Sequence, residues 1–195
     1  MDYLKEAERV HLLNAKWWTD LQTGKPVAQK RRRRLILMIS ELTECMEAER
    51  KSLTDDHLPH RKGAEVEMAD FVIRCLDMLG APADLLDRPI GWMPQDSQRI
   101  ALIANDPIDT ARDVFEYVID DHDPSDYLFE LIKFVTSLNR TAYRTDFATL
   151  IACAEYYCTV FGYDLWAAYE DKLEYNVSRA DHQLTNRKEE GGKKW

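Results

Sequence analysis

The sequence predicts an all-α protein, and three observations carry that prediction. Only seven Gly and seven Pro occur in 195 residues, so the residues that end helices and form turns are scarce. Hydrophobic residues make up 45% of the chain and charged residues 31%, and the chain is long enough to bury a core. Apolar residues recur at helical spacing along most of the chain. We expect one helical domain over residues 1–182 and a polar, loose tail over 183–195.

The individual helices follow from the apolar repeats and from the Gly, Pro and Asp residues that interrupt them. Periodicity is weakest from residue 81 to about residue 106, so that part is predicted as loops around one short helix. The helices are expected over residues 2–22, 29–52, 62–79, 100–104, 107–121, 126–143, 146–161 and 164–179.

Charge and cysteine content exclude several classes of protein. The formal net charge of −9 argues against a protein that binds nucleic acid, which normally carries a basic excess. The four cysteines lack the spacing of metal ligands and lie in helical stretches, which indicates small buried hydrophobes of a reducing compartment. No apolar run approaches about 18 residues, and the N-terminus is charged, so we expect a cytoplasmic protein without a membrane partner.

Two pairs of carboxylates, Glu41 with Glu44 and Glu67 with Asp70, organise the predicted site. Each pair is three residues apart on an expected helix, so its two side chains share a face. Two such helices packed together gather four carboxylates, which repel one another and are costly to desolvate unless cations lie among them. Oxygen ligands of this kind suit Mg²⁺, which in turn suits phosphates. The pairs therefore predict a magnesium site for a phosphorylated substrate.

Apolar stripes on the same two helices predict how they are buried. On the third helix, Glu67, Asp70, Arg74 and Asp77 share the side opposite the stripe. An ordinary salt-bridged surface and a partly buried strip both fit this pattern. The stripe residues are Leu35, Met38, Ile39, Leu42, Cys45 and Met46 on the second helix, and Ala64, Met68, Phe71, Val72, Cys75 and Leu79 on the third.

The last expected helix carries a second set of polar residues. Lys172, Asn176 and Arg179 follow one another at i, i+4 and i+7, which puts them in one stripe beside Tyr175. A lysine, an amide and an arginine in register can hold a triphosphate, with the arginine as a bidentate fork. The alternative is an exposed helix end, where cations favour the helix dipole in any case.

Two further features have an ordinary and a functional interpretation. Trp17 and Trp18 are adjacent and cannot both face one core, so we expect one to pack inward and the other to line a groove or an interface. The basic run Arg31–Arg34 can bind nucleic acid or phosphate, but a solvated face, or pairing with a partner's acids, is the preferred interpretation.

Two loops are also interpreted structurally. His57 and His60 have no Cys or third His nearby, so a capping or phosphate-contacting loop is favoured over a zinc site. Asp120, Asp121 and Asp123 lack the spaced ligands, the glycine and the final Glu of a calcium loop. We expect a turn in which Asp caps the next helix.

Taken together, the carboxylate pairs and the late basic stripe resemble the MazG-type, all-α nucleoside triphosphate pyrophosphohydrolases. That family carries Glu-Glu-x-x-Glu on one helix, Glu-x-x-Asp on the next, and a later Lys with Asn and Arg. Here the first motif is present with Ser40 in place of its leading Glu, so four of five usual carboxylates remain, and Glu47 is a candidate to compensate. The matching stretches are Ser40-Glu41-Leu42-Thr43-Glu44, Glu67-Met68-Ala69-Asp70 and Lys172-Leu173-Glu174-Tyr175-Asn176-Val177-Ser178-Arg179.

Other stretches are similar to the phage- and bacterium-borne branch of that family, which would place the protein in the host cytoplasm if a phage encodes it. The resemblance covers most of residues 10–80 and 146–194, and residues 81–145, an expected helical insertion, contain no matching motif. The stretches are Asn14 with Trp17-Trp18-Thr19-Asp20, Asp55-Asp56-His57-Leu58-Pro59-His60-Arg61, Arg179-Ala180-Asp181-His182 and Gly191-Gly192-Lys193-Lys194.

The resemblance implies a helical bundle of the all-α NTP pyrophosphatase type that hydrolyses an NTP or dNTP to the monophosphate and pyrophosphate, a house-cleaning activity on the nucleotide pool. Mg²⁺, or Mn²⁺ as a substitute, would be held by both carboxylate pairs, and Glu41 or Glu44 would act as general base. Arg179 and Lys172 would stabilise phosphate charge, with Asn176 and Tyr175 beside them.

The resemblance also implies that Asn14, Trp17 or Trp18 contacts the base, and that the protein is a homodimer or tetramer. Two alternatives stay open. One is a regulatory protein that binds a nucleotide or alarmone with weak or no hydrolysis, which Ser40 motivates. The other is a helical interaction module without enzymatic activity, whose carboxylates and basic residues are solvated faces.

Overall fold

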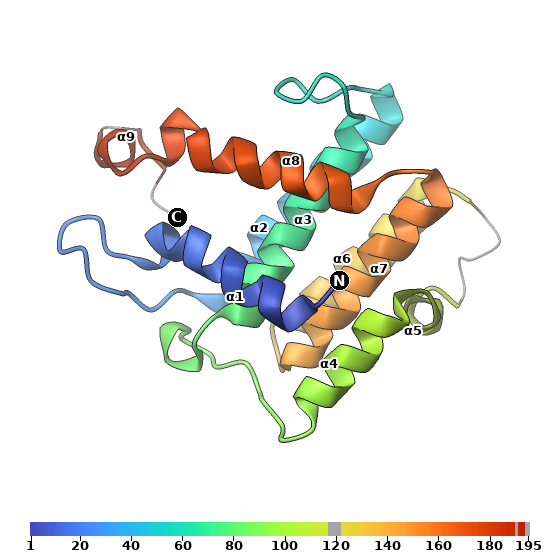
Figure 1. Ribbon diagram of the computed structural model, residues 1–195, viewed down its shortest axis with the longest axis horizontal. Helices are drawn as coiled ribbons and strands as arrows, with labels where there is room; N and C mark the ends of the chain where they lie inside the picture. Colours follow the sequence, from blue (N-terminus) through green and yellow to red (C-terminus); the bar gives the residue numbers. More distant parts are fainter. Residues whose placement is uncertain (117–121, 190, 194–195) are drawn as a thin grey trace.

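The computed structural model describes residues 1–116, 122–189 and 191–193, and within these ranges the regular structure is helical, with no strand (Figure 1). The prediction of an all-α fold is therefore confirmed. Short 3-10 turns follow α1 and α8 and precede the loop before α4. The helices are α1 (Tyr3–Asn14), α2 (Arg31–Lys51), α3 (Gly63–Gly80), α4 (Asp96–Asn105), α5 (Pro107–Val114), α6 (Pro124–Ser137), α7 (Arg144–Phe161), α8 (Leu165–Ser178) and α9 (Leu184–Lys188).

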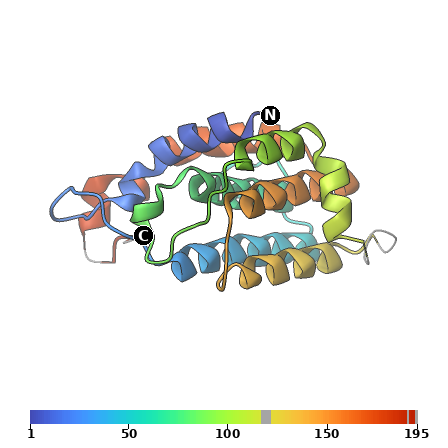
Figure 2. The same ribbon diagram turned by 90° about the horizontal axis from the view of Figure 1, so that it is seen from below.

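Helix α3 is the centre of the bundle, because it contacts α1, α2, α7 and α8. Figure 2 shows α3 and α7 in a middle layer, with α2 and α6 side by side beneath them and α1 above. All six residues of the predicted α3 stripe are buried, and so are Val66 and Ile73 on its other faces. A helix that is apolar on most faces is surrounded by other helices, which explains its central place.

The predicted stripe of α2 is also confirmed. Leu35, Met38, Leu42 and Cys45 are buried, and Ile39 and Met46 are partly buried against the same core; all four cysteines are buried thiols.

The middle helices belong to the same core. Helices α4 and α5 pack on α7, and α6 packs on α2 and α7. Their buried side chains include Ile100, Ala111, Tyr127 and Leu131. The segment without a matching motif thus covers the side of α7 that faces away from α8 (Figure 1).

Several predicted helix ends were wrong. The first helix ends at Asn14 instead of residue 22, because a 3-10 turn follows and the Asp20 carboxylate then accepts hydrogen bonds from the backbone N–H groups of Gln22 and Thr23. The short helix expected at 100–104 begins earlier, at Asp96, whose carboxylate accepts from the Met93 N–H. Such local side-chain bonds compete with helical ones and stop or start a helix.

Other boundaries shift toward nearby caps. Helix α5 ends at Val114, before the residue 121 that the sequence predicted, and α6 spans 124–137 instead of 126–143. Asp123 caps α6 by accepting from the Ser125 N–H, as the acidic turn predicted. Asp120 and Asp121 lie outside the described residues.

The basic run at the start of α2 corrects the expectation of a solvated face. Arg31 and Arg34 are only 3% and 6% exposed. The Arg31 guanidinium donates to the carbonyl oxygens of Pro89, Asn139 and Arg140. A guanidinium has five donors, so it can satisfy several loop carbonyls at once. Arg31 therefore fastens the start of α2 to two loops.

The tail also differs from the expected loose segment in the part that the structure describes. Residues 184–188 form α9, and the side chain of Arg187 is 0% exposed. The paired glycines allow this packing: a Cβ on Gly192 would press on the carbonyl oxygens of Asn186 and Arg187. Here a glycine permits close backbone contact where the sequence suggested looseness.

No helix in the described ranges is long and apolar enough to cross a membrane.

Candidate functional site

A cavity of about 670 Å³ lies between α2, α3 and α8. It is lined by residues from segments that are far apart in the sequence: the end of α1, the two carboxylate-bearing helices, the loop at 53–57, α8 and the tail. The predicted residues that line it are Asn14, Trp17, Glu41, Glu44, Glu67, Asp70, Lys172, Asn176 and Arg179.

Two predicted site residues do not line the cavity. Trp18 is 2% exposed, and its indole N–H donates to Asp77 at 3.0 Å, so it is the inward-facing member of the Trp pair. Tyr175 packs beside the cavity, where its ring stacks on His57 with centroids 4.7 Å apart.

Three carboxylates meet where α2 and α3 face each other. Glu41, Glu67 and Asp70 each offer one oxygen, and these oxygens lie within 4.8 Å of one another. Glu44 lines the same cavity one turn further along α2, but it is exposed and outside this tight group. The sequence thus predicted all three members of the cluster and counted Glu44 as a fourth ligand, which lies outside this tight group.

Burial raises the pKa of two of these carboxyl groups. Desolvation, together with nearby Asp70 and Glu44, raises the pKa of Glu41 to about 7, even though Arg74 opposes the shift. Desolvation and the Asp70 charge raise the pKa of Glu67 to about 8. Both shifts arise because like charges are held together in a poorly solvated place. A bound cation would relieve this repulsion.

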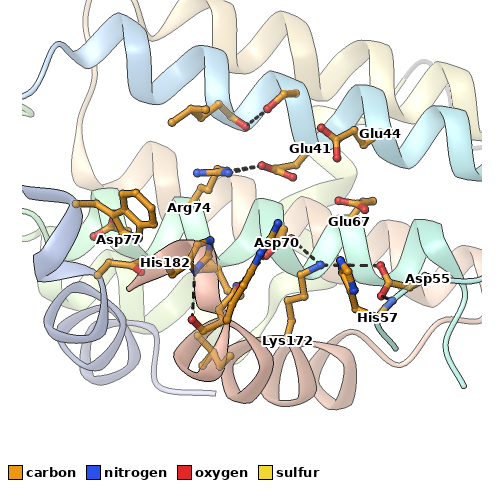
Figure 3. A pocket seen from close by; sticks show the side chains of 18 of the residues that line it. Glu41, Glu44, Asp55, His57, Glu67, Asp70, Arg74, Asp77, Lys172 and His182 are labelled. Carbon is orange, nitrogen blue, oxygen red and sulfur yellow. Dashed lines mark hydrogen bonds and ion pairs between the residues drawn. The ribbon is translucent and has the colours of Figure 1, made fainter. Parts of the chain in front are cut away.

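Two protein cations offset part of the negative charge, as Figure 3 shows. Arg74 donates to Glu41 Oε1 at 2.5 Å, and Lys172 Nζ lies 3.0 Å from Asp70 Oδ2. Asn176 donates its amide N–H to Asp70 Oδ1 at 3.3 Å. With Asp55, whose carboxylate lies 3.9 Å from Lys172, five carboxylates line this part of the cavity against these two cations. Among the described residues neither Glu44 nor Glu67 has a hydrogen-bond or ion-pair partner, which leaves room for a metal ion.

The polar strip of α3 faces the cavity, so of the two interpretations the partly buried strip holds. Arg74 pairs with Glu41 on α2, and not with Asp70 or Asp77 on its own helix. Asp77 is 4% exposed and accepts from Trp18, with His11 Nδ1 at 2.9 Å and Arg34 Nη1 at 3.7 Å. It is a buried anchor between α1, α2 and α3.

The loop before α3 fastens onto α8. Asp55 accepts from the backbone N–H groups of His57 and Leu58, and its second oxygen lies 3.9 Å from Lys172 Nζ. His60 Nε2 lies 3.0 Å from Asp171 on α8. In the described ranges neither histidine joins a group of metal ligands. Sequence reasoning did not name Asp55 as a site residue. The Asp-Asp-His-Leu-Pro sequence indicated a loop, but not that the Asp55 carboxylate forms the turn and lies near Lys172.

The opposite end of the cavity is basic and aromatic. Lys16, Arg179, His182 and Lys193 line it together with Trp17. Arg179 Nε lies 2.7 Å from Asp181, and the His182 ring meets the Trp17 ring edge-on at 5.0 Å. Burial, with the charges of Lys193 and Arg179, lowers the pKa of His182 to about 4, so this ring is neutral at pH 7.

Ser40 stands at the position where the MazG-type motif has its leading Glu. Ser40 lines the cavity, and its hydroxyl donates to the Leu37 carbonyl oxygen at 2.8 Å. Glu47, the expected compensating residue, forms ion pairs with Arg50 and Lys51 on its own helix. Its carboxylate is therefore engaged away from the three-carboxylate cluster.

Comparison with family models, with curated proteins and with solved structures returned no match. The resemblance to the MazG-type enzymes therefore rests on the residues quoted above, and the function is inferred from the cavity itself.

Proposed function

We propose that the protein hydrolyses a nucleoside triphosphate, NTP or dNTP, to the nucleoside monophosphate and pyrophosphate with the help of Mg²⁺. The observation that carries this proposal is the cluster of Glu41, Glu67 and Asp70 in a cavity that also contains Lys172 and Asn176. Carboxylates that exceed the nearby cations suit a hard divalent ion, and the cations beside them suit phosphate oxygens.

The donor set fits Mg²⁺. Glu41, Glu67 and Asp70 would hold it, with Glu44 close by, and all four supply oxygen ligands only. The raised pKa values of Glu41 and Glu67 indicate a cluster whose charge the protein alone does not balance. When bound, the ion neutralises phosphate charge and makes the attacking water more acidic.

Glu44 is the better placed of the two candidate general bases. The Glu41 carboxylate is held by Arg74 at 2.5 Å, whereas Glu44 is exposed and has no partner in the described chain. Glu44 would take a proton from water as the water oxygen bonds to the α-phosphorus. The bond from the α-phosphorus to the bridging oxygen breaks, and pyrophosphate leaves.

The groups on α8 would bind the phosphates. Lys172 is 4% exposed and rigidly held between Asp70 and Asp55, so it offers a fixed positive charge. Burial lowers the pKa of Lys172, but the charge and hydrogen bond of Asp70 outweigh that effect and raise it, so the amine stays protonated. Asn176 would orient a phosphate oxygen, and Arg179 would exchange its bond to Asp181 for one to phosphate.

The aromatic end of the cavity would take the base. Trp17 lines it and Asn14 lies beside it, which gives a stacking surface and an amide for hydrogen bonds. Every base can stack on an indole ring, so this wall would contribute to affinity for the nucleotide more than to selectivity between bases.

A panel of NTPs and dNTPs tests the proposal. Each nucleotide is incubated with the protein and Mg²⁺ or Mn²⁺, and release of monophosphate and pyrophosphate is followed, with EDTA as the control. We expect turnover of at least one nucleotide that stops in EDTA. If none is hydrolysed with either metal, the protein is not this hydrolase.

One observation favours a second candidate, a nucleotide-binding regulator with little hydrolysis. Ser40 stands where the related enzymes carry a carboxylate, and its hydroxyl is committed to Leu37. Calorimetric titration with the same nucleotides separates the two candidates. Binding without turnover selects the regulator, and Ser40→Glu should then raise the rate.

A further inference from the structure

Arg187, in the tail of the chain, contacts the ring of Trp17. The Arg187 guanidinium lies 3.9 Å from the centre of the Trp17 ring, and its Nη1 donates to the Lys16 carbonyl oxygen at 2.6 Å. Trp17 lines the cavity, but Arg187 does not. The guanidinium therefore lies over the Trp17 ring without being part of the cavity lining.

Arg187 is itself held in place. It is fully buried, and its Nε donates to the Lys193 carbonyl oxygen at 3.2 Å. The backbone around Gly192 folds against α9 so closely that a Cβ there would lie 2.7 Å from the Arg187 carbonyl oxygen. A long side chain with four rotatable bonds loses much conformational entropy when it is fixed. Because the tail already fixes Arg187, the guanidinium can hold the Trp17 ring without a further ordering cost when a ligand binds.

Trp17 follows α1 in a 3-10 turn and is partly buried against the core. Among the described residues, Arg187 lies over its ring, and the His182 ring meets it edge-on with centroids 5.0 Å apart. Without Arg187, the ring can rotate away from the wall of the cavity. Because Trp17 also lines the cavity, part of its ring is accessible to a planar group bound there.

We propose that Arg187 is a positioning residue, which holds the Trp17 ring as a fixed wall of the cavity and so determines how tightly the base of a nucleotide binds. Because the base is assigned to Trp17 only by the proposed function, the role of Arg187 rests on that function. The tail is then part of the binding site, although Arg187 contacts no substrate.

The experiment compares nucleotide with a ligand that has phosphates but no base. Wild-type protein, Arg187→Ala and Arg187→Lys are assayed with the best nucleotide of the panel and Mg²⁺, and inorganic tripolyphosphate is titrated as a competitive inhibitor. Arg99→Ala is the matched control, because Arg99 is exposed on α4 and has no partner in the ranges that the structure covers.

We expect Arg187→Ala to raise KM for the nucleotide by about fivefold to tenfold, with kcat within about twofold and the inhibition constant of tripolyphosphate unchanged. Arg187→Lys keeps the charge but loses the planar group, so its KM should fall between the two. Arg99→Ala should match the wild type. An unchanged KM in Arg187→Ala overturns the proposal, and so does an equal loss of tripolyphosphate binding, which indicates general damage.

Gly192→Ala is a second variant that leaves both side chains intact. Its added methyl group collides with the carbonyl oxygens of Asn186 and Arg187, so it should displace the tail and raise KM in the same way. A wild-type KM in this variant, with the tail shown by proteolysis to be displaced, also overturns the proposal. Failure of the wild type itself to bind or hydrolyse any nucleotide rejects the proposed function, and the role of Arg187 falls with it.

Discussion

The side chain of Arg74 determines how much unbalanced charge the cavity holds. Its guanidinium reaches across to Glu41 at 2.5 Å, although Asp70 and Asp77 are its neighbours on α3. Asp70 instead forms an ion pair with Lys172 and accepts a hydrogen bond from Asn176, both on α8. Glu41 and Asp70 thus each have a cation from a different helix, and Glu67 has no ion-pair partner among the described residues.

Asp70 joins the proposed metal site to Lys172, for which we propose phosphate binding, so we expect it to be the most sensitive single residue. Asp70→Asn keeps the shape but removes a charged ligand and the partner of Lys172. We expect kcat to fall by roughly 100-fold or more, as for loss of a strong electrostatic contact in a transition state, with the far-UV circular dichroism unchanged. Asp84→Asn, at an exposed position, is the control. A rate near that of the wild type would exclude Asp70 from the site.

The pKa of Glu67 predicts how stability depends on pH in metal-free protein. Its pKa is about 8 in the folded state against an ordinary value of 4.5, so the folded state binds more protons between these values. The free energy of unfolding should therefore fall as the pH rises from 5 to 8, and fall less in Glu67→Gln. Urea denaturation in EDTA at three pH values measures this. Parallel curves for Glu67→Gln and wild type would contradict it, and Glu8→Gln, exposed on α1, should run parallel to the wild type.

At the scale of elements, the close approach of α1 and α3 sets where the end of α1, followed by Trp17, meets the cavity. The two helices touch at Gly80, where a Cβ would press on the Ala7 carbonyl and lie 3.0 Å from His11 Cβ. Only a residue without a side chain allows this distance. The crossing therefore depends on one glycine at the end of α3.

Gly80→Ala should destabilise the protein. The clash is with backbone, which cannot rotate away, and overpacking of this kind costs about 1–3 kcal/mol. In a domain of this size that lowers Tm by several degrees, measured by thermal unfolding. Gly24→Ala is the comparison: its φ of +67° carries strain of about 1 kcal/mol, but open space surrounds it. A larger loss at Gly24 than at Gly80 would show that the helix crossing can relax.

The elements with regular apolar repeats were predictable from the sequence, and those built on carbonyl contacts were not. The stripe of α3 identified its buried face, and the three clustered carboxylates are among the four that their spacing, together with the late basic stripe and the family resemblance, had singled out. Arg31 and Arg34 were predicted to be solvated, but they donate to the backbone carbonyl oxygens of Pro89, Asn139 and Trp17. Every residue has a backbone carbonyl group, so these acceptors do not stand out in a sequence. No sequence pattern marks which of these a guanidinium will reach.

The whole molecule is organised around one helix that touches both ends of the chain. Helix α3 packs against α1 near the start and α8 near the end, and against α2 and α7 between them. Because these five helices share one core, unfolding any of them exposes buried surface of the others. We therefore expect one cooperative transition, with far-UV circular dichroism and tryptophan fluorescence changing together.

Mg²⁺ should shift that single transition upward. The cluster forms only when α2 and α3 pack together, so the ion binds the folded state, and at 100 times its Kd it adds about 2.7 kcal/mol. Thermal unfolding with Mg²⁺ and with EDTA measures the shift. Asp70→Asn should show little or none. Separate transitions for the two probes, or an equal Mg²⁺ effect in Asp70→Asn, would contradict this picture.

The ion pair between Asp70 and Lys172 also determines when the site can form during synthesis of the chain. The two residues form an ion pair at 3.0 Å but are 102 positions apart. At ~5–20 residues per second, a ribosome adds the lysine about 5–20 s after the aspartate. During that interval the nascent carboxylates on α2 and α3 have Arg74 and the cations of the surrounding solution as counter-charges. The site is thus complete only after α8 and the residues that follow it have emerged.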